Sequence, residues 1–396
     1  MKKILILLLP LLLLSGCYNY QEMNDLGIIT ATEIDKENDE YKITVQIVNP
    51  KNHSDASSAN QPAFVTYTST GKTIHEAYRN LIQKTSRKIY AMHMQVLIIK
   101  DNLAKENLSE MLDFYFRNIE IRKEFYVLID TTENNNNNNN NDKLLEILTP
   151  LTNLSSQNIL NTLESDNKYI SVSNLITFND LMDTYLDEHK ELVLPTIYIK
   201  GNEQFGDEET NIETTSSDSD LYLGNLAIFK DEKMLGILSR EESITVNLIK
   251  GEAKEMLITF NCNENKFASS KVILDKPKIE IDTKKLQINI TIKGNADLTE
   301  YTCNDNLNSD KVIEEINNKL NKHYVDIMNN SIKNINEKYN SDVYGFRNMI
   351  YKKDYKYYNQ IKDDYYNKVF NNLNFNIKSD ISLITKGNLL GGTYEK

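Results

Sequence analysis

The sequence predicts a multi-domain α+β protein, with a mixed sheet in its N-terminal domain and an antiparallel sheet plus long helices in its C-terminal domain. Two observations predict this fold class. In the first half, strand patterns alternate with amphipathic helix patterns, and in the second half hairpin-like strands precede long helices. The chain has 396 residues, which is enough for two or three domains with sizeable cores.

The N-terminal part begins with strand patterns at residues 25–29, 41–48 and 64–68, and the second of these alternates apolar and polar residues. A helix is expected to start after Thr73, because Thr73 and Glu76 have the spacing of a capping box. Apolar residues then recur at helical intervals in one stripe, namely Ile74, Ala77, Tyr78, Leu81 and Ile82.

The alternation of strands and helices continues to residue 200. Strands are expected at residues 95–100 and 124–130, with a helix over residues 108–116 between them. Residues 134–141 are all asparagine and predict a disordered loop insertion, because the tract has no apolar area to bury. Further helices are expected at residues 144–148, 154–163 and 175–186. Pro195 then marks residues 192–200 as an edge strand.

Residues 201–220 carry seven acidic side chains and no basic one. With their Ser, Thr and Gly content, they predict a solvated linker between a domain of residues 17–200 and a domain of residues 221–396. So many carboxylates could also bind calcium, but the Asp-x-Asp-x-Asp-Gly spacing of a calcium loop does not occur. The linker is therefore the favoured interpretation.

The C-terminal part opens with a hairpin pattern, in which residues 223–229 and 234–238 flank a turn at residues 231–233. Further strands are expected at residues 255–260, 271–274, 278–281 and 286–292. A long helix is expected over residues 309–339, since Ser309 and Asp310 suit its N-terminus. A second helical stretch covers residues 354–369, and residues 373–384 alternate like a final strand.

The first seventeen residues have the layout of a secretory signal peptide that ends in a lipobox. Lys2 and Lys3 precede an apolar run over residues 4–14, which is too short to span a membrane comfortably. The tetrad Leu14-Ser15-Gly16-Cys17 predicts removal of residues 1–16 and attachment of diacylglycerol to the Cys17 thiol. The alternatives are an uncleaved anchor helix or an ordinary signal peptide with a chance cysteine. The favoured interpretation places the protein outside the cytoplasmic membrane, held by lipid.

Charge and composition exclude some classes of partner. Removal of residues 1–16 changes the net charge from −12 to −14, and such an acidic body is repelled by nucleic acid and by anionic lipid headgroups. We therefore expect no nucleic-acid partner. Membrane attachment is expected to depend on the acyl chains.

The sequence offers no constellation for catalysis, a cofactor or a metal. The five histidines are scattered, and no phosphate loop, GxSxG elbow or Cys/His nucleophile pattern occurs. Cys262 and Cys303 could form a disulfide or serve as small apolar fillers beside strands. A tyrosine cluster over residues 351–366 could pack a helix onto the sheet or form a protein contact surface.

Several segments together resemble the GerC-type lipoprotein subunit of bacterial spore germinant receptors. The segment from Cys17 to Ile29 is similar to the family's opening, although Tyr18 and Asn19 replace its usual Trp-Asp pair. The segment from Asp342 to Phe346 is similar to its Asp-x-x-Gly-Phe/Leu signature. The other similar segments, in order along the chain, are residues 44–50, 71–77, 93–99, 116–122, 227–230 and 234–238.

The resemblance implies a non-enzymatic subunit on the outer face of the spore inner membrane, anchored through acylated Cys17. Its implied partners are two membrane-embedded receptor subunits, A and B, with which it would support assembly and signalling in germination. A solute-binding lipoprotein of a membrane transporter is the alternative, but it would have two similar lobes, whereas the halves of this chain differ. A lipid-anchored cell-wall hydrolase is a further alternative without a supporting catalytic pattern.

Overall fold

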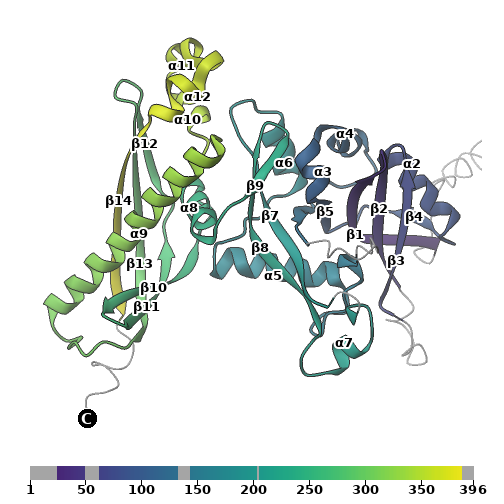
Figure 1. The fold of residues 1–396 in the computed structure, drawn as a ribbon, viewed down its shortest axis with the longest axis horizontal. Helices are drawn as coiled ribbons and strands as arrows, with labels where there is room; N and C mark the ends of the chain where they lie inside the picture. The colour runs from purple at the N-terminus through teal and green to yellow at the C-terminus, as the bar shows by residue number, and fades with distance from the viewer. Residues whose placement is uncertain (1–24, 50–61, 133–142, 203–204, 386–396) are drawn as a thin grey trace, which may run out of the picture.

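The computed structural model describes residues 25–49, 62–132, 143–202 and 205–385. It contains a nine-stranded sheet and a five-stranded sheet that lie toward opposite ends of the long axis of the molecule (Figure 1). Helices pack against both sheets, so the predicted α+β class is confirmed. Cys17 and the asparagine tract 134–141 lie outside the described residues.

The first sheet is mixed, as expected. Its strands are hydrogen-bonded in the order β3-β2-β1-β5-β6-β7-β8-β9, and β4 pairs with the start of β1. The central pairs β1–β5, β5–β6 and β6–β7 are parallel, whereas the flanking pairs are antiparallel. The strands are β1 (Leu26–Glu37), β2 (Glu40–Val48), β3 (Phe64–Gly71), β4 (Lys88–Tyr90), β5 (Val96–Lys100), β6 (Tyr126–Asp130), β7 (Val193–Gly201), β8 (Ser219–Lys230) and β9 (Lys233–Ile237).

Apolar side chains of the first sheet are buried on both of its faces. Leu97 and Ile99 belong to one core cluster with residues of α2, α3, α4 and α6, whereas Val96 and Ile98 belong to another with residues of α5 and η5. A strand that is covered on both sides needs a continuous apolar run, which explains the sequence of β5. The helices are α2 (Ile74–Asn80), η4 (Leu81–Gln83), α3 (Asp101–Glu106), α4 (Ser109–Arg117), η5 (Leu144–Glu146), α5 (Ser155–Tyr169) and α6 (Phe178–Tyr185).

Local capping explains where two of these helices begin. The Thr73 side chain accepts a hydrogen bond from the Glu76 amide at 3.1 Å, as expected, but the Glu76 carboxylate accepts from the Lys72 amide and not from the Thr73 amide. At α6, Thr177 and Asp180 form a complete capping box. This box places the start of α6 at Phe178, three residues after the expected position.

The acidic segment 201–220 is a hairpin connection in the first sheet. The flanking strands β7 and β8 pair antiparallel, with partners from Val193↔Ile228 to Gly201↔Ser219, and α7 (Thr210–Glu213) lies between them. The chain leaves the first sheet only after β9. This arrangement differs from the expected linker between two domains, because the pairing of the strands on either side is not visible in the composition of the segment.

The second sheet consists of antiparallel pairs to which one parallel strand is added. Strand β13 pairs antiparallel with β12 along its first half and with β11 along its second half, while β14 runs parallel to it. A long helical crossover separates β13 from β14, and such a connection permits parallel pairing. The strands are β10 (Glu255–Asn263), β11 (Lys266–Leu274), β12 (Lys278–Asp282), β13 (Gln287–Tyr301) and β14 (Asn374–Thr385).

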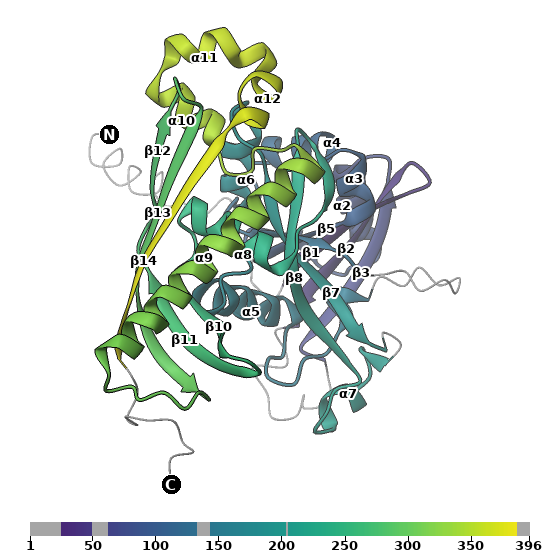
Figure 2. The same ribbon diagram turned by 60° about the vertical axis from the view of Figure 1, so that its left-hand side comes forward.

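Helix α9 (Asp310–Tyr339) crosses one face of the second sheet diagonally and confirms the long helix that the sequence predicts (Figure 2). Its Asn321 side chain forms two hydrogen bonds with the backbone of Ile381 in β14, one to the carbonyl and one from the amide, each of 2.8 Å. Asn317 accepts another bond from the Leu383 amide at 2.8 Å. The asparagine side chains therefore form hydrogen bonds with backbone groups along the edge of β14.

The helical stretch expected over residues 354–369 is interrupted, and two helices that were not expected are also present. The stretch over residues 354–369 is divided into α11 (Tyr355–Ile361), η7 (Lys362–Asp364) and α12 (Tyr365–Lys368), and η8 (Phe370–Asn372) follows. Helix α8 (Arg240–Lys250) leads from the first sheet to the second, and α10 (Phe346–Lys353) follows α9. Among the described residues, no helix is both long enough and apolar enough to span a bilayer.

Cys262 and Cys303 form a disulfide, which settles the choice that the sequence leaves open. Their Cα atoms are 6.4 Å apart, and both side chains are buried in the core of the second sheet. The bond joins the end of β10 to the segment after β13. It therefore ties a strand at one side of the sheet to the chain that leads into α9.

Candidate functional site

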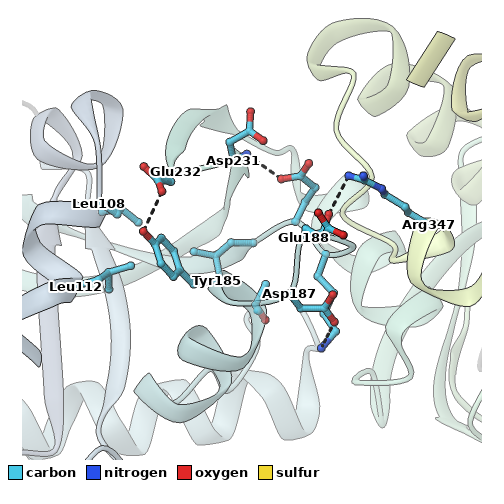
Figure 3. A pocket seen from close by; sticks show the side chains of 12 residues that line it. Leu108, Leu112, Tyr185, Asp187, Glu188, Asp231, Glu232 and Arg347 are labelled. Atoms are coloured by element: carbon cyan, nitrogen blue, oxygen red, sulfur yellow. Dashed lines mark hydrogen bonds and ion pairs between the residues drawn. The ribbon is translucent and has the colours of Figure 1, made fainter. Parts of the chain in front are cut away.

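A polar hollow of about 360 Å³ lies where the first and second sheets meet. The loop at residues 187–192, the turn between β8 and β9 and the start of α10 line it, together with residues of α4 and α6 (Figure 3). These segments are far apart in sequence. The site therefore exists only in the folded chain.

The turn between α9 and α10 is bound to the first sheet by backbone and side-chain contacts. The Ser341 hydroxyl donates to the Phe229 carbonyl at 2.7 Å, and Lys230 Nζ donates to the Asn340 carbonyl at 2.7 Å. Asn340, with φ of 47°, has the left-handed conformation that ends α9, and Gly345, with φ of 79°, has the same conformation just before α10. The turn consequently brings α10 back toward the hollow.

The buried carboxylate of Asp342 fixes this turn. It accepts hydrogen bonds from the amides of Phe346 at 3.1 Å and Arg347 at 2.6 Å, and from the Tyr365 hydroxyl at 2.8 Å. The two amide bonds start α10, and the third holds α12. Burial raises the pKa of Asp342 to about 7. The signature residues Asp342, Gly345 and Phe346 thus have a structural role where the loops of the first sheet meet the helices that follow α9. We call this region the junction.

Glu191 connects the first sheet to helix α12. Its carboxylate accepts a hydrogen bond from the Tyr366 hydroxyl at 2.6 Å and another from the Asp231 amide at 2.9 Å. The ring of Tyr366 also lies under Lys230, whose Nζ is 3.9 Å from the ring centroid. Burial raises the pKa of the Glu191 carboxyl, and the two hydrogen bonds oppose this change.

Arg347 lies on the other side of the hollow and clamps the loop after α6. Its Nη1 donates to the Glu188 carbonyl at 2.8 Å, and its Nη2 donates to the Tyr358 hydroxyl at 3.3 Å and to the Lys362 carbonyl at 3.4 Å. One guanidinium therefore joins a loop of the first half of the chain, as Figure 3 shows for Glu188, to two helical segments of the second half.

An aromatic contact completes the junction. The His189 ring is stacked on Tyr351, with a centroid distance of 4.3 Å, and it also contacts Tyr358. His189 Nδ1 lies 2.6 Å from a carboxylate oxygen of Asp187. The imidazole is thus held between a carboxylate of its own loop and the tyrosines of α10 and α11.

Several carboxylates line the hollow, and those of Asp187, Glu191 and Glu232 have hydrogen-bond partners. Tyr185 donates to Glu232 at 2.9 Å, and Lys190 lies 3.1 Å from Asp187. Among the described residues, no group of three or more His, Cys, Asp or Glu side chains is arranged to hold a metal ion. The charge-assisted hydrogen bonds around the hollow hold the two halves of the protein in a fixed position relative to each other.

Two family models match the chain in succession. "Spore germination protein N-terminal domain" matches residues 19–199, and "Spore germination B3/ GerAC like, C-terminal" matches residues 224–387. The chain belongs to the GerAC-like family of spore germination proteins. The two matches cover most of the chain, so the resemblance expected from the sequence is confirmed.

Curated relatives of this GerAC-like chain include Spore germination protein KC of Bacillus subtilis strain 168. It is 26% identical over 391 residues, which are 95% of this chain and 93% of the relative. Spore germination protein GerQC of Bacillus cereus is 22% identical over 81% of this chain and 82% of the relative. The crystal structure of the GerBC protein is similar in fold, with a TM-score of 0.52, 16% identity and coverage of 89% of this chain and 96% of that chain.

The tyrosine cluster divides between the two roles that the sequence allows. Tyr358 and Tyr365 are buried, and Tyr366 bridges to the first sheet. Tyr351 and Tyr355 are exposed, with 59% of Tyr355 accessible. The cluster therefore packs the helices at the junction and leaves part of its aromatic surface uncovered.

Sequence reasoning missed Glu191 and Arg347, because neither lies in a motif with a local pattern. A signal for Asp342 was present, since its segment carried part of the family resemblance. His75 and His93 lie apart from the junction. His75 lines a wider hollow of about 770 Å³ beside α2 and α4, where it accepts from Arg79 Nε at 3.2 Å, and His93 contacts the ring of Tyr90.

Proposed function

We propose that this GerAC-like protein is the lipid-anchored, non-catalytic subunit of a nutrient germinant receptor. It is held through acylated Cys17 on the outer face of the spore inner membrane, and it supports assembly and signalling with membrane-embedded A and B subunits. The observation that carries the proposal is the order of the features. A lipobox ending at Cys17 directly precedes the first family region, and the second family region follows it.

The junction between the sheets supports a scaffolding role. Asp342, Glu191 and Arg347 link the loop after α6, the β8–β9 turn and the helices after α9. A body whose parts are held in this way presents its surfaces to a partner in one arrangement, which lowers the entropic cost of binding. A lipid tether adds to this effect, because it raises the effective concentration of the body beside partners in the same membrane.

The anchor is tested by comparing wild-type spores with spores that carry Cys17→Ser or, as a control outside the lipobox, Asn24→Ser. We expect Cys17→Ser to abolish the mass of the acyl group on the mature N-terminus and to remove the protein from the inner-membrane fraction. The Asn24→Ser protein should retain its acyl group. An acylated protein in the Cys17→Ser strain would contradict the proposed attachment site.

The partners are tested by affinity capture of the anchored protein from detergent-solubilised spore membranes, followed by mass spectrometry. We expect two multi-span membrane subunits among the captured proteins. Recovery of a transporter permease in their place would favour a solute-binding lipoprotein. Spores whose receptor subunits remain assembled and responsive after deletion of this gene would overturn the role in assembly.

A further inference from the structure

In one stretch of this acidic chain, every Lys, Arg, Asp or Glu side chain is a basic one. Residues 77–100 contain five lysine or arginine residues and no aspartate or glutamate, whereas the whole chain has a net charge of −12. Three of the five, Lys84, Arg87 and Lys88, lie within five consecutive residues. Such a local reversal of charge identifies a surface that differs electrostatically from the rest of the molecule.

The structure places these three residues together at the end of η4 and the start of β4. Lys84 and Lys88 are exposed and Arg87 is half-buried, and Ile82 beside them has 48% of its surface accessible. None of the three forms an ion pair with any described residue. Lys84 Nζ donates to the Thr68 carbonyl at 2.6 Å, which holds its charge against the edge formed by β3. We call Ile82, Lys84, Arg87 and Lys88 the basic edge.

The basic edge lies beside the point where the described chain begins. Lys88 in β4 pairs with Leu26 in β1, and paired strands are about 4.8 Å apart. Leu26 is nine residues from Cys17, so even a fully extended chain places it within roughly 30 Å of the lipid. The second sheet lies toward the other end of the long axis (Figure 1). The basic edge is therefore at the end of the molecule that an anchor at Cys17 keeps near the membrane.

We propose that the basic edge docks on an anionic bilayer surface and orients the protein on the membrane, an inference that rests on lipid attachment at Cys17. A basic side chain held at an anionic surface strengthens binding roughly fivefold, so three contribute roughly a hundredfold. The attraction acts over about 8 Å at physiological ionic strength, which requires the edge to face the headgroups closely. Because the rest of the body is acidic, an anionic membrane repels the other orientations. The exposed Ile82 side chain adds apolar contact at the interface.

The test uses the mature chain coupled chemically through the Cys17 thiol to a single alkyl chain. One alkyl chain binds membranes only marginally, so partition into vesicles remains sensitive to protein contacts. The test variant is Lys84→Gln/Arg87→Gln/Lys88→Gln. The matched control is Lys276→Gln/Lys284→Gln/Lys285→Gln, which removes the same charge from exposed side chains near β12. Partition is measured with vesicles of phosphatidylcholine alone and with added phosphatidylglycerol.

We expect the test variant to partition into phosphatidylglycerol vesicles roughly a hundredfold less than the wild type, and the control to differ much less. All three proteins should partition equally into phosphatidylcholine vesicles, and high salt should remove the difference. Equal losses in the two variants would show an effect of net charge alone and would overturn the proposal. A larger loss in the control would overturn it as well, since the opposite end would then face the membrane.

A second measurement reads the orientation in the wild-type protein. On phosphatidylglycerol vesicles, an impermeant amine-reactive reagent should label Lys84 and Lys88 several-fold more slowly than on phosphatidylcholine vesicles, while labelling of Lys284 and Lys285 stays constant. Equal labelling of Lys84 and Lys88 on both vesicles would contradict the docking. Because the alkyl chain is added chemically, these outcomes are independent of native acylation, whose failure is read separately from the mass of the mature N-terminus.

Discussion

At the scale of single residues, Asp342 makes the stability of the protein depend on pH. Its pKa is about 7 in the folded protein because of burial, against about 3.9 in an unfolded chain. The folded state therefore holds the proton more tightly, so the contribution of Asp342 to stability is fully present below about pH 4 and is lost as pH rises toward 7. The full loss across that window is at most about 4 kcal/mol.

Replacement of Asp342 with Asn should remove this pH dependence, because the amide does not titrate. It should also weaken the start of α10 and lower the free energy of unfolding by about 1–3 kcal/mol at acidic pH, since Asn offers fewer acceptor sites to three donors. Denaturant unfolding at several pH values measures both effects. Asp363→Asn, at an exposed position nearby, is the control and should leave the profile unchanged. A wild-type profile that is flat between about pH 4 and 7 would contradict the explanation.

Tyr366→Phe tests the hydrogen bond that crosses the junction. The variant keeps the ring beneath Lys230 but removes the hydroxyl that donates to Glu191 at 2.6 Å. A hydrogen bond to a charged group is worth about 1.5–3 kcal/mol, so we expect a loss of that order in the free energy of unfolding. Tyr355→Phe, at an exposed ring, is the control and should be near neutral. Equal stabilities of the two variants would mean that the Glu191 contact is not stabilising.

At the scale of elements, the disulfide is the strongest local constraint on the second sheet. It joins residues separated by 41 positions. Closing a loop of that length lowers the entropy of the unfolded chain, which raises the free energy of unfolding by about 4 kcal/mol. We expect the double variant Cys262→Ser/Cys303→Ser to lose stability of that order in denaturant unfolding. Reductant should destabilise the wild type similarly and leave the double variant unaffected. A further loss in the reduced double variant would indicate a different cause.

The elements with a strong local pattern were predictable from the sequence. The alternation of apolar and polar residues in β2, the apolar run of β5 and the apolar stripe of α9 each identify one element, because each pattern is contained in the segment itself. The parallel pairing of β14 with β13 and the hairpin around residues 201–220 were not predictable in this way. They depend on which distant strand a segment pairs with, and a local pattern does not contain that information.

The residues of the candidate site were likewise predictable from the sequence only where their roles are local. Asp342 and Gly345 could be found by resemblance, since their roles in capping and in a left-handed turn are local. Glu191 and Arg347 gain their roles from contacts with residues more than one hundred and fifty positions away, Tyr366 and Glu188 respectively. Their side chains are ordinary in sequence and become important only where the two sheets meet.

At the scale of the whole molecule, the sheets are joined by more than the covalent chain. Val193, Leu226 and Ile228 of the first sheet belong to the same buried cluster as the core of the second sheet. Cleavage of the hairpin between β7 and β8 should therefore leave both fragments associated. A protease site inserted between the exposed residues Thr215 and Ser216 tests this by gel filtration after cleavage. Co-elution is expected without denaturant, and separation of the fragments would contradict the shared core.

The asparagines of α9 have a consequence for the exposed edge of the second sheet. An open strand edge is a template for pairing with a strand of another chain. Asn321 imitates a peptide group against Ile381, and Asn317 does so in part against Leu383, so each molecule carries its own substitute for a neighbouring strand. At these two residues the helix blocks the edge of β14 against the addition of a strand from another copy.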